Sequence, residues 1–133
     1  MKTLLVLVLL LLARGTFVSA QAHEFPDTSG NAFARLCSVI DKDVETMIHT
    51  DYGDEMACLG YVSGFVNGVE FEAGYAEAQA GRKLHKPFCR PDDTENGQLI
   101  RIVLKYIRDN PEEAHHQTAV LVMNALAKAY PCK

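Results

Sequence analysis

The stretch KPFCRPDDTENGQL, residues 86–99, places a cysteine between two prolines just before a polar segment of the kind that starts helices. The chain closes on a second cysteine in YPCK, residues 130–133. The prolines restrict the backbone around Cys89, because the ring fixes φ and the residue before a proline avoids the helical region. The backbone around Cys89 is therefore restricted, and the first question is which other cysteine pairs with Cys89.

The chain carries four cysteines, Cys37, Cys58, Cys89 and Cys132. An even number in a small exported chain predicts two disulfides. Four cysteines allow three pairings, and loop entropy does not select among them. A 22-residue loop gives about 3.4 kcal/mol and a 44-residue loop about 4.0 kcal/mol.

Four segments carry apolar residues at helical spacing. The first helix begins after Ser29 as its N-cap and runs to Ile40, or continues through Ile48. The second runs from about Asp54 to Ala80, the third begins near Asp93 or Thr94 and the fourth ends before Pro131. No segment alternates with period two, so the sequence predicts an all-α fold, a small disulfide-braced helical bundle of about four helices.

Two boundaries are predicted from turn and cap chemistry. Asp51, Gly53 and Asp54 form a turn signal that is expected to end the first helix. In DNPEE, residues 109–113, Asn110 fits an N-cap and Pro111 the first helical position. The fourth helix is therefore expected to begin at this point.

Helix geometry selects the disulfides. Cys58 lies near the start of the second helix and Cys89 lies past its end, about 35 Å away along a straight helix. A disulfide needs Cα atoms within about 7 Å. Antiparallel neighbours instead bring Cys37 beside Cys58, and Cys89 beside Cys132, so these two pairs are the predicted disulfides.

The second helix has a glycine on each of three successive turns, Gly60, Gly64 and Gly68. Each glycine costs roughly 1 kcal/mol relative to alanine in a helix, so the spacing indicates that another helix approaches closely there. Packing against a helix of the same chain is the favoured interpretation, and the seam of a homodimer is the alternative. Phe71 and Tyr75 share one face further along; ordinary packing on neighbouring helices is the favoured interpretation, and an arm that meets a partner is the alternative.

Residues 1–22 are predicted to be a secretory signal peptide, because Lys2 precedes an apolar run that ends in small residues. Residues 23–133 are then a single exported, soluble domain. Removing Lys2 and Arg14 from 13 basic residues leaves 11 against 17 acidic ones, a formal charge of −6. That charge makes nucleic acid and anionic membranes poor partners.

No residue pattern specifies catalysis. Cys58 could act as a nucleophile with His49, His115 or His116 as base, but the even cysteine count already assigns this thiol to a disulfide. Metal ligation needs converging ligands, whereas His115 and His116 are adjacent and the other histidines stand alone. The acidic pairs at Asp92/Asp93 and Glu112/Glu113 are interpreted as helix caps. The expectation is a non-enzyme with no catalytic, metal or cofactor residue.

Five short sequence motifs of this chain occur together in a known family. They are LC (36–37), CLGYVSGFVNG (58–68), FCRP (88–91), TENGQLIRIVLKYIRDNP (94–111) and ALAKAYPC (125–132). In this order they resemble the Rap/Tai family of periplasmic immunity proteins, and together they span residues 36–132. All five motifs consist of residues that build the fold, so the resemblance identifies no effector-contacting residue in this chain.

The resemblance implies a periplasmic immunity protein, often dimeric, that binds and inhibits a peptidoglycan amidase effector of type VI secretion. It implies no catalysis. A hypothesis of a different class is a periplasmic stress protein, an acid-activated chaperone with no effector, whose apolar stripes become exposed when acids and histidines protonate. The sequence contains 17 acidic residues and five histidines, which permit this second function without specifying it.

Overall fold

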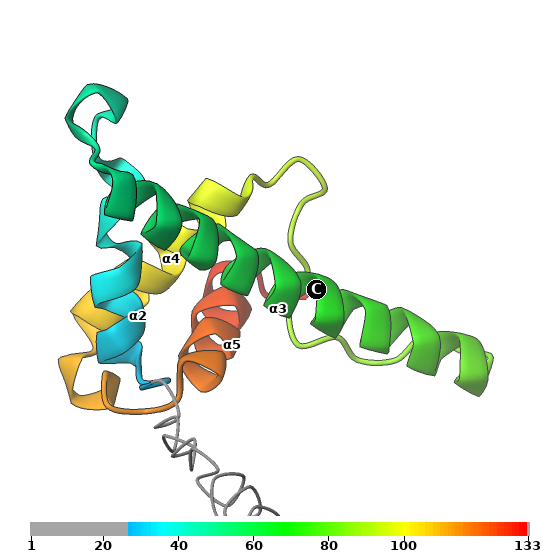
Figure 1. Ribbon diagram of the computed structural model, residues 1–133. Helices are drawn as coiled ribbons and strands as arrows, with labels where there is room; N and C mark the ends of the chain where they lie inside the picture. The colour runs from blue at the N-terminus through cyan, green and yellow to red at the C-terminus, as the bar shows by residue number, and fades with distance from the viewer. Residues whose placement is uncertain (1–26, 133) are drawn as a thin grey trace, which may run out of the picture.

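The computed structural model describes residues 27–132, so the predicted signal peptide lies outside the described part of the chain. Four α-helices make up most of it (Figure 1): α2 Gly30–Leu36, α3 His49–Ala80, α4 Asn96–Asp109 and α5 Thr118–Ala129. Short 3₁₀ turns cover Cys37–Asp41, Val44–Thr46 and Pro111–Glu113. Residues 27–132 contain no strand, and the all-α prediction is confirmed.

The core lies where α2 and the first half of α3 cover the hairpin of α4 and α5 (Figure 1). Residues of α4 and α5 at three- and four-residue spacing provide most of its buried side chains: Leu99, Ile100, Val103, Ile107, Leu121, Val122, Ala125 and Leu126. The last buried residue of α3 is Val66. The helix continues for another 14 residues, and Figure 1 shows this part extending past the bundle.

The start of α2 is held by the segment that precedes α5. The backbone N–H groups of Gly30 and Asn31 donate to the carbonyl oxygens of His116 and Ala114, each at 2.9 Å. A β-carbon at Gly30 would overlap Leu121 and lie 3.0 Å from the Ala114 oxygen. Glycine is therefore required at Gly30 for close packing, while the Ser29 hydroxyl caps α2 as predicted by accepting from the Ala32 N–H.

The fourth helix begins at Thr118 and not at Asn110, so this predicted boundary is wrong. Asn110 is the N-cap only of the short 3₁₀ turn Pro111–Glu113, and its side-chain amide donates to the Tyr106 carbonyl at the end of α4. Pro111–Glu113 form only a short turn, and the Glu113 carboxylate accepts from the Tyr106 hydroxyl at 2.9 Å. The helix-start residues thus bond back to Tyr106 of α4, and the segment between Glu113 and Thr118 bonds to the start of α2 before α5 begins.

The boundary between the first two helices is also wrong. α2 ends at Leu36 and tightens into the turn Cys37–Asp41, whereas α3 begins at His49, before the turn signal. Asp51 does not break the helix, because its carboxylate lies in the first turn and accepts the Ile48 N–H at 3.0 Å. An acidic side chain in the first turn stabilises a helix through unpaired N–H groups.

Of the two acidic pairs expected at helix starts, Glu112 and Glu113 lie in the first turn of the 3₁₀ helix Pro111–Glu113, whereas Asp92 and Asp93 do not cap α4. The N-cap of α4 is Glu95, without a side-chain cap bond, and Asp92 and Asp93 lie exposed ahead of it. Both disulfides join the pairs expected from antiparallel geometry. Cys37 bonds to Cys58 and Cys89 bonds to Cys132, with Cα separations of 5.3 Å and 5.0 Å.

Candidate interaction surfaces

The geometry of Cys58 rules out the nucleophile hypothesis. Its sulfur is in a disulfide and the residue is fully buried in the core. Residues 27–132 contain no free cysteine and no group of three or more metal-ligating side chains. His115 and His116 are exposed, with ring centroids 4.3 Å apart. The features left to explain are surfaces that can bind another molecule.

The first such surface is the protruding loop, residues 42–48, which extends away from the bundle next to the start of α3 (Figure 1). No residue of this loop is buried, and two aliphatic side chains are well exposed, Val44 at 68% and Ile48 at 64%. Two exposed acidic residues, Asp43 and Glu45, lie beside Val44. The loop therefore presents apolar and negative groups together at one end of the molecule.

Short-range hydrogen bonds hold the protruding loop in one conformation. The Asp43 carbonyl oxygen accepts both the backbone N–H and the hydroxyl of Thr46, at 2.9 Å and 2.8 Å. At the base of the loop, the Lys42 ammonium donates to the buried Asp51 carboxylate at 2.7 Å. This bond, followed by that from the Ile48 N–H, holds the pKa of the Asp51 carboxyl below its ordinary value. A loop fixed in this way loses little conformational entropy on binding.

The second surface is the glycine face of α3, a run of exposed, uncharged residues three or four positions apart. We define it as Gly53, Ala57, Gly60, Gly64, Asn67, Gly68, Phe71, Tyr75 and Ala78. A β-carbon at Gly60, Gly64 or Gly68 would meet nothing within 4 Å. The favoured interpretation, that a helix of the same chain packs on these glycines, is therefore wrong.

Phe71 and Tyr75 extend the glycine face beyond the bundle. Phe71 is 76% exposed and Tyr75 is 59% exposed. Their rings stack on each other, with centroids 6.3 Å apart and 16° between the planes. Ordinary packing of these two residues on neighbouring helices is thus wrong, and they form an unpartnered aromatic pair. Exposed apolar groups gathered in this way mark interaction sites.

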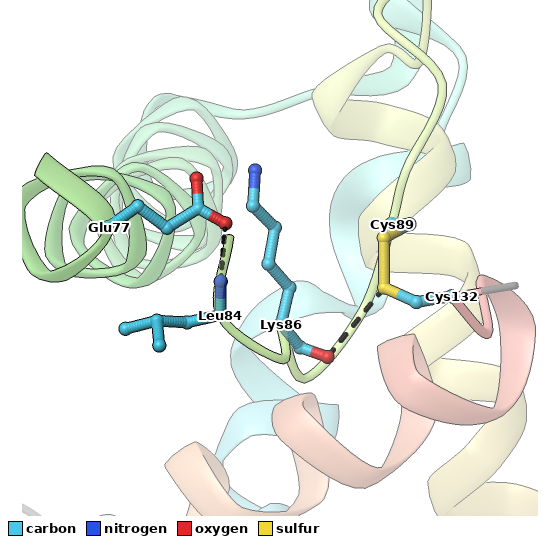
Figure 2. The surroundings of a disulfide bond; sticks show 5 residues. All are labelled: Glu77, Leu84, Lys86, Cys89 and Cys132. Atoms are coloured by element: carbon cyan, nitrogen blue, oxygen red, sulfur yellow. Dashed lines mark hydrogen bonds between the residues drawn. A yellow bond between two sulfur atoms is a disulfide. The ribbon is translucent and has the colours of Figure 1, made fainter. Parts of the chain in front are cut away.

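A strap, residues 81–88, leads the chain back from the far end of α3 (Figure 2). Gly81 ends the helix in the left-handed conformation, at φ 60°. Figure 2 shows Glu77 reaching from α3 to the strap, where its carboxylate accepts the Leu84 N–H at 3.1 Å. The Cys89–Cys132 disulfide then fastens the strap's end to the C-terminus. The disulfide sulfur of Cys132 lies 3.6 Å from the Lys86 carbonyl oxygen, a contact without a hydrogen bond because the sulfur carries no proton.

An apolar groove of about 490 Å³ opens between α2 and α3, beside the glycine face. Ala57 and Tyr61 belong to its wall on α3, and Phe33 and Leu36 to its wall on α2. A smaller groove of about 210 Å³ lies between α4 and α5 and includes Ile102 and Tyr106. Among residues 27–132, no helix is long and apolar enough to cross a membrane.

The family model described as Rap1a immunity proteins matches residues 29–132, almost the whole described chain. The chain belongs to the Rap1a immunity protein family. No curated protein and no solved structure matches it. Membership of the Rap1a family implies an immunity protein for a type VI effector, which acts by binding that effector protein.

The protruding loop of this Rap1a family member was not predicted as a surface. Val44 and Ile48 are spaced like core positions, so the sequence alone predicts an extension of the first helix through them. The signal that identifies the loop is polar: Asp43 and Thr46 favour a tight turn, and Asp51 starts a new helix. For Phe71 and Tyr75, by contrast, the sequence allows an arm that meets a partner, although ordinary packing is the favoured interpretation there.

Proposed function

We propose that this immunity protein binds and inhibits a peptidoglycan amidase effector of type VI secretion in the periplasm, and that it has no catalytic activity of its own. Membership of the Rap1a immunity family carries the proposal. A predicted signal peptide over residues 1–22 would bring residues 23–133 to the periplasm, where both disulfides can form.

The protruding loop is the surface proposed to enter the amidase cleft. Its exposed Val44 and Ile48 can become buried in a concave site, while Asp43 and Glu45 meet basic groups at the rim. Hydrogen bonds already order the loop, as in many tight inhibitors that bind without rearrangement. This support is physical: a preformed convex element with apolar tips is suited to a cleft.

The test measures inhibition of the cognate amidase by titration. Val44→Ser with Ile48→Ser should raise the inhibition constant at least about 30-fold, because two anchors of about 1 kcal/mol or more each are lost. Both side chains are exposed, so the free protein should keep its stability. Val120→Ser is the matched control, since Val120 is exposed at 46% on α5. Equal inhibition by the control and the double variant would reject the loop as the binding element.

The acid-activated chaperone remains a separate hypothesis. It requires a buried group whose protonation would expose the apolar core. Among the described residues, Asp51 is the one buried charged side chain, and its pKa is lowered. Protonating it requires strongly acid solution, and it lies at the base of the protruding loop, away from the apolar stripe of α4 and α5. This arrangement favours the immunity function over an acid-released core.

A further inference from the structure

A pocket of about 340 Å³, the strap pocket, lies between the far end of α3, the strap and the disulfide at the strap's end. Its charged and polar side chains are Glu77, Lys83, His85 and Lys86, and its apolar surface comes from Leu84 and the two disulfide cysteines. In the view of Figure 2, the Lys86 side chain stands between Glu77 and the disulfide, with its ammonium group away from the strap. We propose that the strap pocket binds a short peptide by the peptide's free carboxylate end.

The basic side chains of the strap pocket differ from most others in the described part of the chain. Five basic residues elsewhere form ion pairs with acidic side chains: Arg35, Lys42, Arg90, Arg101 and Lys105. Lys83, His85 and Lys86 are exposed, and none of them forms an ion pair within residues 27–132. Glu77, the acidic residue of the pocket, instead accepts the Leu84 N–H at 3.1 Å. The pocket therefore keeps an excess of positive charge, which an anionic group complements.

The backbone that carries these side chains is held at both ends. Gly81 turns the chain back at φ 60°, and the bond from Leu84 to Glu77 ties the strap to α3. At the other end, the Cys89 N–H donates to the Tyr130 carbonyl at 2.8 Å, next to the disulfide. The lysines of the pocket lie between these fixed points, so binding an anion there costs little backbone entropy.

The mixed lining of the strap pocket favours a peptide end over a small inorganic anion. The two lysine ammonium groups and the His85 imidazole can donate hydrogen bonds to a carboxylate. Leu84 and the disulfide can contact an aliphatic side chain beside that carboxylate. The volume of about 340 Å³ lies at the lower end of the range for pockets that hold small organic ligands. A carboxylate attached to a short aliphatic residue therefore matches both parts of the lining.

The stem peptides of peptidoglycan have this chemistry, because they are short, contain alanine and end in free carboxylates. The choice of this source rests on the proposed function, which places the chain in the periplasm beside that polymer. The protruding loop precedes α3 and the strap follows it, so the two surfaces lie at opposite ends of a helix about 48 Å long (Figure 1). Both can therefore be occupied at once. Binding to the wall raises the effective concentration of the inhibitor where the amidase cuts.

The first experiment titrates the oxidised, exported chain with diacetyl-L-lysyl-D-alanyl-D-alanine, a soluble analogue of a stem peptide. Backbone amide shifts measured by NMR report where the peptide binds. We expect saturable shifts in the strap and none in the protruding loop. The same peptide with an amide in place of its terminal carboxylate should bind at least about 10-fold more weakly, because its charge-assisted hydrogen bonds to the ammonium groups are lost.

The second experiment compares Lys86→Gln with Arg82→Gln as a matched pair. Both substitutions remove one positive charge from an exposed position of the strap, but Arg82 does not line the pocket. Lys86→Gln should weaken binding of the peptide at least about 10-fold. Arg82→Gln should weaken it less than about 2-fold at physiological salt, because the remaining effect is screened long-range attraction. Lys86→Arg keeps the charge and should restore most of the affinity.

The third experiment tests the polymer itself by co-sedimentation with purified peptidoglycan sacculi. The native chain and Arg82→Gln should sediment with the sacculi, whereas Lys86→Gln should remain in solution.

Three results would overturn the proposal. Absence of saturable shifts up to about 10 mM peptide, or equal binding of the amide, would remove the carboxylate site. Binding of the peptide without retention on sacculi would reject the stem peptides as its source. If Lys86→Gln weakens binding of the amidase and the peptide does not bind, the pocket belongs to an acidic segment of the effector. Retention on sacculi by a chain that inhibits no amidase would support the pocket and count against the proposed function alone.

Discussion

Among single residues, Asp51 is one whose sequence context predicts the end of a helix, while in the structure it stabilises the start of one. Near Gly53 and Asp54 it signals a turn, yet in the fold its carboxylate joins the protruding loop to the first turn of α3. It accepts the Lys42 ammonium at 2.7 Å and the Ile48 N–H at 3.0 Å. Both bonds favour the charged carboxylate, so its pKa is lowered.

This coupling predicts how stability depends on pH. Because the folded pKa of Asp51 is depressed, its contribution is complete above the unfolded value of about 3.9. The contribution is lost as the pH falls below that value and through the folded pKa. Asp51→Asn should lower the melting temperature at pH 7 and flatten its decline below about pH 4. Thermal unfolding followed by circular dichroism from pH 7 to pH 2 measures both.

Asp92→Asn serves as the control for the pH series, because Asp92 is an exposed carboxylate ahead of α4 and its side chain makes no hydrogen bond among the described residues. It should reproduce the native curve. An Asp51→Asn protein with the native acid decline would show that other carboxylates cause it.

At the scale of elements, the glycines separate into two physical kinds. Gly30 is enclosed, whereas Gly60, Gly64 and Gly68 face open space in the single chain. Gly68→Ala should therefore stabilise the monomer by about 0.5–1 kcal/mol through helix propensity. Gly30→Ala should destabilise it by about 1–3 kcal/mol through overpacking against Leu121. Urea unfolding at sub-micromolar concentration measures both changes in the free energy of unfolding.

A destabilising Gly68→Ala at that dilution would mean that the glycine face is packed within the monomer. The opposite signs at the two positions make this comparison independent of small errors in either midpoint.

The elements also show what can be predicted from sequence. The apolar stripe of α4 is sufficient to predict that helix, because Leu99, Val103 and Ile107 recur at helical spacing and are all buried. The start of α5 cannot be predicted from local signals, since the helix-start residues Asn110 and Pro111 begin only a short 3₁₀ turn. Backbone groups between Ala114 and Thr118 form hydrogen bonds with residues 28–31, at and just before the start of α2 and more than 80 residues away in sequence. The residues that cap helices locally do not indicate these long-range hydrogen bonds.

The glycine spacing was informative in a different way. It correctly indicates a special face on α3, but it does not say whether the partner belongs to the same chain. Only the three-dimensional arrangement shows that, among residues 27–132, nothing lies within 4 Å of a β-carbon placed at Gly60, Gly64 or Gly68. The protruding loop was missed because its apolar residues are exposed, and helical spacing alone cannot distinguish exposed from buried positions.

At the scale of the whole molecule, the two disulfides lie in different environments. Cys37 and Cys58 are fully buried in the core, whereas Cys89, just after the strap, is exposed and Cys132 is partly exposed. Thiol–disulfide exchange requires access of the attacking thiolate. Mild reductant should therefore open Cys89–Cys132 first, which alkylation and mass spectrometry can follow. Simultaneous reduction of both bonds would mean that the core opens together with the strap.

Loss of the strap disulfide should also have a defined cost. Cys89→Ser with Cys132→Ser opens a 44-residue loop, and chain entropy predicts a loss of about 4 kcal/mol in the free energy of unfolding. The buried Cys37–Cys58 pair should remain oxidised in that variant. Denaturant unfolding of the native and double-variant proteins, under identical non-reducing conditions, gives the difference.

The central claim is that the whole molecule is an inhibitor of a cell-wall amidase. The most direct measurement is a titration of peptidoglycan hydrolysis by the type VI amidase effector of the source organism with the oxidised chain. Activity should fall linearly to zero at one chain per amidase, and the Val44→Ser, Ile48→Ser protein should require a large excess. Undiminished hydrolysis at a tenfold excess of the native chain over every amidase effector of that organism would contradict the account.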